Sequence, residues 1–214
     1  MTMMVVIEER KGLRNFMGVP KEQALRNRRS IIDTASRVFR ERGVDGVGVA
    51  DLMKEAGFTH GGFYNHFKSK DALAAEACAA VLSRAVEDMA GVIEADAEGR
   101  TGSFRAFLES YLSPMHRDDS GQGCPIPAMV TDASRQGDQM QAAYAEGIEM
   151  FIQTMSAYFA RDGESSGPPD TARASAIGLL THLVGTLALA RGVGAANAEL
   201  SEEILATGRS RLPG

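Results

Sequence analysis

Apolar residues recur at three- and four-residue steps along most of the chain, which is the spacing that places side chains on one face of an α-helix. Between residues 22 and 42, for example, Ile31, Ala35, Val38 and Phe39 form a single stripe among basic and polar neighbours. The same pattern, interrupted by glycine, proline and polar segments, predicts helices over residues 22–42, 49–56, 60–67, 70–95, 103–113, 125–136, 139–160, 169–193 and 197–211. Strand-like alternation and longer sequence repeats are both missing from this pattern, so we expect an all-α fold.

Two segments near these helices are expected to lack regular structure. Residues 1–22 contain Gly12, Gly18 and Pro20 and show no sustained period, so we expect a flexible N-terminal arm, in which Met17 is an alternative start. Residues 114–123 are mostly polar and end in a glycine-rich stretch, and we expect a loop there.

A short helix, a glycine turn and a second short helix follow one another over residues 49–67, which is the pattern of a helix-turn-helix. Leu52 and Met53 are expected to face inward, and Phe63 and Phe67 are expected to bury the second helix against the first. The second helix keeps small and polar residues for its outer face, namely His60, Gly61, Gly62, Tyr64, Asn65 and His66. Such side chains can bond base edges and phosphates, so this helix is suited to the major groove of DNA. An ordinary three-helix bundle with a polar face is the alternative.

The segment FTHGGFYNHFKSK at residues 58–70, with Ala35, Phe39 and Gly43 upstream, closely resembles the DNA-binding domain of the tetracycline-repressor (TetR) family. The resemblance extends over about residues 24–80, and beyond them it is limited to a long helical remainder of the right size. It implies that residues 60–67 are the recognition helix and that the DNA contacts come from Thr59, His60, Gly61, Tyr64, Asn65, His66 and Lys70. In such proteins the residue matching Tyr64 holds a phosphate and the one matching Lys70 reaches the DNA backbone.

The sequence departs from the family pattern at three glycines. Gly48 stands where the family commonly has Ser or Thr, which removes a candidate phosphate contact. Gly61 and Gly62 each weaken a helix by about 1 kcal/mol relative to alanine. We therefore expect DNA to complete the ordering of the recognition helix.

Together, the helix pattern and the resemblance divide the chain into three parts. These are a flexible arm over residues 1–22, a helix-turn-helix DNA-binding domain over 23–69 and a helical effector-binding and dimerisation domain over 70–214. The last two helices are expected to form the seam of a homodimer, through Leu179, Leu180, Leu183, Val184, Leu187, Leu189, Leu200, Ile204 and Leu205. The alternative is that these residues form the core of a single chain.

The resemblance also implies a pocket in the second domain for a small-molecule effector, whose identity the sequence does not give. The candidates to line it are Phe107, Tyr111, Cys124, Met129, Tyr144, Phe151 and His182, with Met89 beside them. Each of these side chains can equally belong to the core. Cys124 begins a helix and is expected to have a lowered thiol pKa, which would suit the sensing of electrophiles or oxidants. A ligand that prefers a conformer with wrongly spaced recognition helices would release the DNA.

The charge distribution and the cysteine content limit the classes of binding partner and the cellular location that we expect. The net charge is −5, yet residues 1–70 contain 13 Lys and Arg against 8 Asp and Glu, so a basic N-terminal part precedes an acidic remainder. Only two cysteines, Cys78 and Cys124, are present, which excludes a disulfide scaffold and favours a reducing, cytoplasmic location. The longest apolar run, residues 176–190, is shorter than the roughly 20 residues that cross a bilayer, so no membrane partner is expected.

Motifs for catalysis are missing from the sequence. It contains no phosphate-binding glycine loop with Lys-Ser/Thr, no dinucleotide fingerprint and no His-Glu-x-x-His zinc motif, so we expect no enzyme, metal or cofactor. Two alternatives stay open: a small thiol-dependent enzyme using Cys124 with His116, and a helical adaptor without DNA binding. The expected function is a dimeric, ligand-responsive transcription regulator, more a repressor than an activator, whose partner is operator double-stranded DNA.

Overall fold

The computed structural model describes residues 3–98, 102–161 and 169–213, and within these ranges the regular elements are all helical. In chain order they are α1 (Met3–Arg42), α2 (Val49–Glu55), the 3₁₀-helix η1 (His60–Asn65), α3 (Lys70–Ala97), α4 (Ser103–Tyr111), α5 (Pro114–Asp118), α6 (Pro125–Arg135), α7 (Asp138–Arg161), α8 (Pro169–Gly194) and α9 (Ala198–Ser210). The all-α expectation is confirmed. The segment between α7 and α8, residues 162–168, lies outside the described residues.

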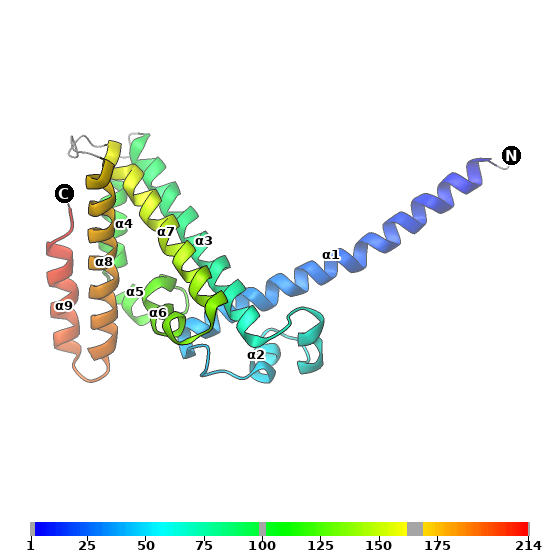
Figure 1. Cartoon of the computed structure of the whole chain (residues 1–214), viewed down its shortest axis with the longest axis horizontal. Helices are drawn as coiled ribbons and strands as arrows, with labels where there is room; N and C mark the ends of the chain where they lie inside the picture. The colour runs from blue at the N-terminus through cyan, green and yellow to red at the C-terminus, as the bar shows by residue number, and fades with distance from the viewer. Residues whose placement is uncertain (1–2, 99–101, 162–168, 214) are drawn as a thin grey trace.

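The first three helices form a small unit around the start of α3 (Figure 1). Gly43 ends α1 with a left-handed φ of 76°, and its N–H donates to the Phe39 carbonyl at 2.9 Å. Gly57 takes φ 83° in the turn between α2 and η1. Both positions favour glycine because a side chain strains this conformation, as the sequence predicted. Phe39, Leu52 and Phe63 meet in the core of the unit.

Two segments that were expected to be irregular are helical. α1 begins at Met3, so the expected arm over residues 1–22 continues the helix that the periodic residues 22–42 nucleate. Its flexibility is untested and stays a prediction. The expected loop over residues 114–123 contains α5, because Pro114 fits a first helical position and the Ser113 hydroxyl accepts the His116 N–H at 3.2 Å.

The remaining helices stand side by side in a taller body, and α3 runs from the small unit into it (Figure 1). Within the body α3 packs along α7, and α8 packs against both α7 and α9. The buried apolar residues form one cluster that extends from Ile31 to Leu212. The proposed domain boundary at residue 70 is therefore not a break in the core, and the three-part division stays a prediction.

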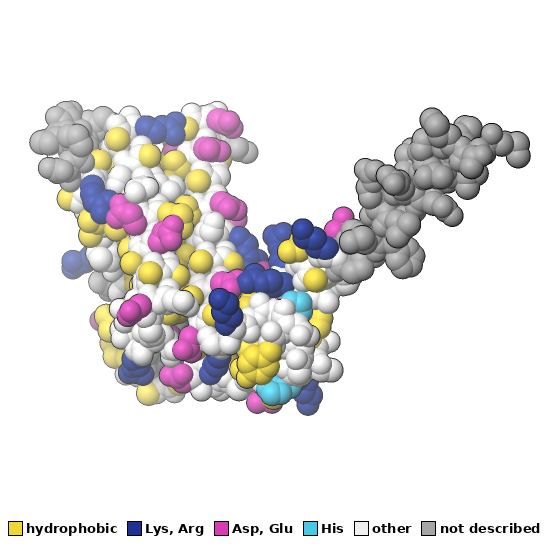
Figure 2. Space-filling view, turned by 45° about the vertical axis from the view of Figure 1, so that its right-hand side comes forward, with side chains coloured by type: hydrophobic (Ala, Val, Ile, Leu, Met, Phe, Trp, Pro, Cys, Tyr) yellow, Lys and Arg dark blue, Asp and Glu magenta, His cyan; other side chains and the backbone are white. Residues whose placement is uncertain are grey.

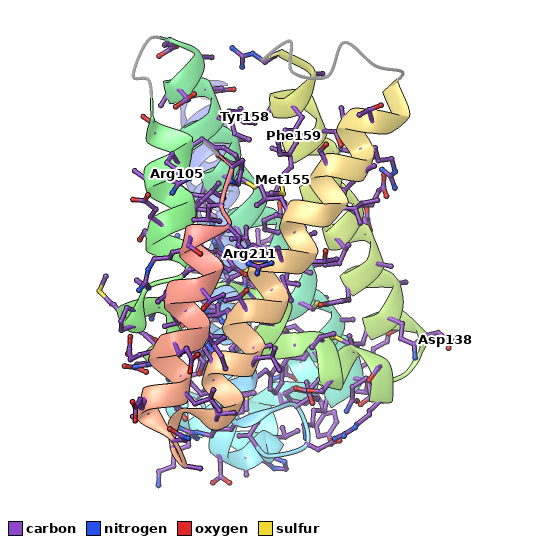
Figure 3. All side chains as sticks on the ribbon, turned by 90° about the vertical axis from the view of Figure 1, so that its left-hand side faces the viewer. Arg105, Asp138, Met155, Tyr158, Phe159 and Arg211 are labelled. Carbon is purple, nitrogen blue, oxygen red and sulfur yellow. The ribbon has the colours of Figure 1, made fainter. Side chains whose placement is uncertain are left out.

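α8 and α9 lie side by side on the outside of the body (Figures 1 and 3). The segment Thr171–Gly194 of α8 is long and apolar enough to cross a membrane by length and composition alone. That segment is longer than the apolar run seen in the sequence. In the structure one face of α8 is core, since Ala176, Leu183, Leu187 and Ala190 are buried.

Most residues that were expected to form a dimer seam are buried within the single chain. Leu179, Leu180, Leu183, Leu187 and Leu205 all belong to the core, so their place in a seam between two copies is corrected. The large apolar side chains that stay exposed on α8 and α9 are Ile177, Leu189 and Leu200. On the neighbouring α4, Arg105 holds the segment after α9 by donating from Nη1 to the Leu212 carbonyl at 3.0 Å (Figure 3).

Candidate nucleic-acid interface and adjoining cavity

The second helix of the helix-turn-helix is shorter and more tightly wound than expected. It is a 3₁₀-helix, His60–Asn65, where the sequence predicted a helix over residues 60–67. Thr59 stands at its N-cap position and is a residue type that commonly caps helices, but the Thr59 side chain makes no capping hydrogen bond. Instead the Thr59 carbonyl accepts the Gly62 N–H at 3.0 Å. The Thr59 hydroxyl therefore remains available for a contact outside the helix.

One side of η1 is buried and the opposite side is exposed, as the spacing of its apolar and polar residues predicted. Phe63 and Phe67 are almost fully buried, whereas Tyr64 is 67% exposed between them. The Tyr64 ring stands edge-on to Phe63, with 5.2 Å between ring centroids, and edge-on to His60 at 6.4 Å. These contacts hold the ring while its outer end faces solvent.

The predicted DNA contacts form one surface patch, which we call the recognition surface. Its exposed members are Thr59, His60, Gly61, Tyr64 and Asn65, and its half-buried members are His66 and Lys70. Figure 2 shows histidine side chains in cyan among dark blue Lys and Arg side chains in the part of the molecule where α1 joins the body. The patch thus offers hydrogen-bond donors and acceptors within a basic surrounding, as contact with DNA requires.

Contacts from α1 and α3 fix η1 in place. The Arg28 guanidinium lies over the Phe67 ring, 4.8 Å from its centroid. The Ser69 hydroxyl caps α3 by accepting the Ala72 N–H at 3.1 Å, and Lys70 is therefore held in the first turn of a capped helix. The residues that directly follow η1 are therefore held against α1 and at the start of α3.

A cavity of about 650 Å³ lies between α1, α3 and the α4–α6 region. Four of the predicted ligand residues line it: Phe107, Tyr111, Cys124 and Phe151. The other four lie elsewhere. Met89 and Met129 are buried in the core, the Tyr144 hydroxyl donates to the Ile126 carbonyl at 3.0 Å, and His182 bonds the Gly208 carbonyl at 3.0 Å, which ties α8 to α9. These four are corrected as cavity-lining residues, because packing or backbone hydrogen bonds occupy them.

His116 and Cys124, the pair that the sequence offered for the alternative of a thiol-dependent enzyme, meet at the wall of the cavity. Nδ1 of His116 lies 2.6 Å from the Tyr111 carbonyl, and Nε2 lies 2.7 Å from the backbone nitrogen of Cys124. A carbonyl only accepts and an amide N–H only donates, so His116 is neutral with its proton on Nδ1. Burial lowers the pKa of His116, although the hydrogen bond to Tyr111 raises it.

The pKa of the Cys124 thiol is shifted in the direction opposite to the one expected. Burial raises the pKa of the Cys124 thiol, while Tyr111, the Ile126 backbone and two arginines lower it to a smaller extent. The predicted lowered pKa is therefore wrong, because desolvation outweighs the helix start and the nearby cations. His116 Nε2 accepts from the Cys124 backbone and not from its thiol, so the two side chains do not form an activated thiol pair.

Arg40 is a cavity residue that the sequence reasoning missed. It lies near the end of α1, and its guanidinium donates to the Gly121 and Gly123 carbonyls, the second at 3.4 Å. Burial lowers the pKa of Arg40. Its position before Gly43 suggested only a favourable charge at a helix end, and no signal in the sequence indicated that it reaches residues 121–123.

α6 joins the cavity wall to the small N-terminal unit. An Asp132 carboxylate oxygen accepts the Val44 N–H at 3.1 Å, directly after the end of α1. The Gln136 side chain donates to Asp45 at 3.1 Å. These two hydrogen bonds connect α6 and its C-terminal end to the segment between α1 and α2. Within the described part of the chain, no group of three or more His, Cys, Asp or Glu side chains gathers in a metal-binding arrangement.

Comparison with known proteins points to bacterial regulators. The family described as "Bacterial regulatory proteins, tetR family" matches residues 31–77, which contain α2, η1 and the flanking helices. The HTH-type transcriptional repressor DhaR of Mycobacterium sp. (strain GP1) is 27% identical over 58% of this chain and 61% of DhaR, so the match spans less than two thirds of that repressor. An uncharacterized HTH-type transcriptional regulator of Mycobacterium tuberculosis is 27% identical over 77% of this chain and 84% of the relative.

Solved structures share the fold over most of the chain. Reduced Escherichia coli NemR superimposes with a TM-score of 0.67 at 21% identity and covers 86% of this chain and 96% of NemR. A TetR-family transcriptional regulator from Agrobacterium tumefaciens gives a TM-score of 0.70 at 16% identity, over 89% of this chain and all of that structure. At these identities the likeness concerns the fold.

Proposed function

Since the chain belongs to the tetR family of bacterial regulatory proteins, we propose that it is a DNA-binding transcriptional repressor that a small molecule releases from its operator. The observation that carries the proposal is the recognition surface. Its polar residues are exposed on η1, directly above the buried Phe63 and Phe67. A short element with such a surface can enter the major groove while its apolar side keeps it attached to the protein.

Within this surface the residues have different roles. Tyr64 and Lys70 bind phosphates and position the protein, so they contribute affinity for any sequence. His60, Asn65 and His66 contact base edges or nearby phosphates, and Gly61 allows close approach of the backbone. The Thr59 hydroxyl, which is not used in a cap, contacts the DNA backbone.

The repressor acts as a homodimer, because one η1 reads only a few base pairs and two copies are needed for a specific site. Ile177, Leu189 and Leu200 are exposed apolar residues on α8 and α9, and they support a seam through these two helices. Dimerisation is common in the family, and it sets the distance between the two recognition surfaces.

Release of DNA follows from the position of the cavity. Arg40 of α1 and Val81 of α3 both line it. The same two helices also adjoin the recognition surface, because Arg28 of α1 contacts Phe67 and α3 begins at Lys70. A ligand that favours a different spacing of α1 and α3 relative to α6 shifts the protein toward a conformer that does not fit the operator.

A mobility-shift experiment on the DNA upstream of the protein's own gene, repeated across a salt series, tests the proposal. We expect specific binding whose logarithm falls linearly with the logarithm of salt, by about 0.9 for each neutralised phosphate. Binding that is equal for promoter and bulk DNA at low salt would contradict the proposal and would fit a helical adaptor.

Single substitutions then separate the roles. Tyr64→Phe and Lys70→Ala are expected to weaken binding to all sequences alike, by about tenfold each, because each removes a phosphate contact. Asn65→Ala is expected to change the preference among sequences. Arg211→Ala removes an exposed charge just beyond α9 and serves as the matched control that keeps full affinity.

A further inference from the structure

Buried polar atoms without hydrogen-bond partners gather at one place in the described part of the chain. They are Nε of Arg40, Nη1 of Arg191 and the hydroxyl oxygen of Tyr111, which has only the weakly accepting Cys124 thiol beside it. Arg40 and Tyr111 line the cavity, and Arg191 lies behind its wall, where it donates to the backbone carbonyl of the lining residue His116 at 2.7 Å. Buried polar groups are almost always satisfied in folded proteins, so a cluster of three unsatisfied groups beside a cavity indicates a missing partner.

The two arginines in this cluster lack a carboxylate partner among the described residues. Arg40 donates to the Gly121 and Gly123 carbonyls, and Arg191 donates to the Arg117 carbonyl at 3.0 Å and the His116 carbonyl at 2.7 Å. A backbone carbonyl carries no net charge, and neither half-buried guanidinium bonds a carboxylate among the described residues, although exposed Asp119 attracts both through space.

Other charged groups around the cavity are already paired. Arg84 bonds Asp33 at 2.7 Å, and Arg37 bonds Glu41 at 3.0 Å. Arg40 is thus an arginine of the lining that bonds no carboxylate among the described residues, and the lining also contains the exposed acidic residues Asp33 and Asp88.

We propose that the effector is a small organic carboxylate, which binds with its charged end on Arg40 and Tyr111 and its apolar part against Phe107, Phe151 and Val81. This inference rests on the proposed function and names the chemical class of its effector. The Nε–H of Arg40 and the hydroxyl of Tyr111 supply two donors for the two carboxylate oxygens. A single negative charge fits better than a multiply charged phosphate, because Asp88 in the lining repels further anionic groups.

Binding of a carboxylate at this point also provides the link to DNA. Arg40 belongs to α1, and its present partners are the carbonyls of Gly121 and Gly123, next to the start of α6. A carboxylate competes with these neutral carbonyls for the guanidinium, because hydrogen bonds between charged groups are roughly twice as strong as neutral ones. The contact between α1 and the segment before α6 is thereby rearranged. The raised pKa of Cys124 favours such reversible binding over covalent capture of an electrophile.

The test uses the full chain and pairs of compounds that differ only in charge. Benzoate, 3-phenylpropanoate, hexanoate and decanoate are each compared with the corresponding uncharged primary amide, at equal ionic strength, in thermal-shift and calorimetric titrations without DNA. We expect at least one carboxylate to raise the melting temperature in a concentration-dependent manner. The amides and inorganic phosphate are expected to have no such effect. The active carboxylate is expected to release the operator in a mobility shift.

Variants locate the binding site. Arg40→Gln and Tyr111→Phe are each expected to weaken carboxylate binding by about 10- to 100-fold, because each removes one donor to a charged group. Arg84→Gln is the matched control, since it removes a cavity arginine that is already paired with Asp33, and it is expected to keep the affinity. Cys124→Ser is also expected to keep it.

Three outcomes would overturn the inference: amides that bind as well as carboxylates, no carboxylate binding at low-millimolar concentration, or unchanged affinity in Tyr111→Phe. Tyr111→Phe keeps the ring and the packing, so it decides the question even if Arg40→Gln fails to fold. Because the titrations contain no DNA, carboxylate binding without operator binding contradicts only the proposed function. Operator binding without carboxylate binding contradicts only the present inference.

Discussion

The hydrogen bonds of His116 determine its charge state at the level of a single side chain. Its Nδ1–H donates to the Tyr111 carbonyl, and its Nε2 accepts the Cys124 N–H. A proton on Nε2 would face the Cys124 N–H and break that hydrogen bond. Burial is the largest effect and lowers the pKa of His116; the hydrogen bond to Tyr111 raises it, and the smaller effects of Arg191 and Asp119 lower and raise it, respectively.

A pH dependence of stability follows from this lowered pKa. Below the ordinary histidine value of about 6.5, the unfolded chain takes up a proton that folded His116 refuses. The free energy of unfolding is therefore expected to fall as the pH decreases from 7.5 to 5.5, by at most about 1.4 kcal/mol per pH unit for this one group. Urea unfolding at both pH values measures the difference.

His116→Gln stays neutral at every pH, so this variant is expected to lose part of the pH slope. The carboxylates of Glu55, Asp118 and Glu149 have pKa values lowered by arginine partners and titrate below this window. An identical slope in the wild-type protein and His116→Gln would contradict the assignment of the effect to His116.

Single residues differ in how far the sequence reveals their environment. Phe63, Tyr64 and Phe67 were placed correctly, because alternation of apolar and polar residues within one short helix directly gives the buried face. Arg40 and the raised pKa of Cys124 were not predicted. They depend on contacts between residues 40 and 121–124, which are distant in sequence, and on burial, which a local pattern does not define.

At the scale of elements, η1 combines two opposing requirements. It must present the recognition surface, yet Gly61 and Gly62 stabilise a helix by about 1 kcal/mol less per residue than alanine. A 3₁₀-helix has weaker hydrogen-bond geometry than an α-helix, so the element has little stability of its own and depends on Phe63 and Phe67.

We therefore expect the amides of residues 60–66 to exchange with solvent rapidly in the free protein and to become protected on operator binding. The amides of α2, in the same unit, provide the internal reference. Gly61→Ala is expected to slow the exchange of η1 in the free protein, because a Cβ at Gly61 meets only open space. Slow exchange throughout residues 60–66 before DNA is added would contradict this expectation.

Close contact between two helices gives a second prediction at this scale. A Cβ on Gly147 of α7 would lie 2.8 Å from Cβ of Leu82 on α3, so the two helices can approach only because residue 147 is glycine. Gly147→Ala is expected to lower the free energy of unfolding by about 1–3 kcal/mol through overpacking.

Gly91→Ala on α3 is the matched control, because a Cβ at Gly91 has no neighbour within 4 Å. This substitution is expected to raise the stability by about 0.5–1 kcal/mol through helix propensity. Denaturant unfolding at one fixed protein concentration compares the two variants. Equal changes in the free energy of unfolding of the two variants would show that the close approach of α3 and α7 does not require glycine at residue 147.

Element boundaries followed from the sequence wherever a long apolar period met a clear stop signal. The starts of α3 and α4 agree with the prediction because Ser69 and Gly102 mark them. α5 was missed because it has only 5 residues, too few to show a period, although Ser113-Pro114 is a recognisable start. The sequence did not show that η1 is a 3₁₀-helix, because over so few residues a 3₁₀-helix and an α-helix place the same apolar side chains on one face.

At the scale of the whole molecule, α8 has two different faces. One face is core, as Leu183 and Leu187 show, whereas Ile177 and Leu189 are exposed on the same helix. The sequence alone showed only that α8 is apolar nearly all round, so it did not distinguish core residues from seam residues. That distinction depends on how α8 is oriented against α7 and α9, which is a property of the assembled body.

Leu189 is 63% exposed on α8, which makes it the most direct test of the homodimer. Leu189→Glu adds a negative charge to the proposed seam. The new carboxylate would have to be desolvated if that surface were buried against a second copy. In a single chain the new carboxylate would remain in water, so the fold is expected to persist. The variant is therefore expected to be monomeric by light scattering while its circular dichroism is unchanged.

Loss of the dimer should also remove operator binding, because the two recognition surfaces act on half-sites about one helical turn apart. Val130→Glu, at an exposed apolar residue of α6 outside the proposed seam, is the matched control and should leave both the mass and the DNA affinity unchanged. A dimeric Leu189→Glu protein would contradict a seam at this position. A monomer that still binds the operator with full affinity would show that dimerisation is not what positions the recognition surfaces.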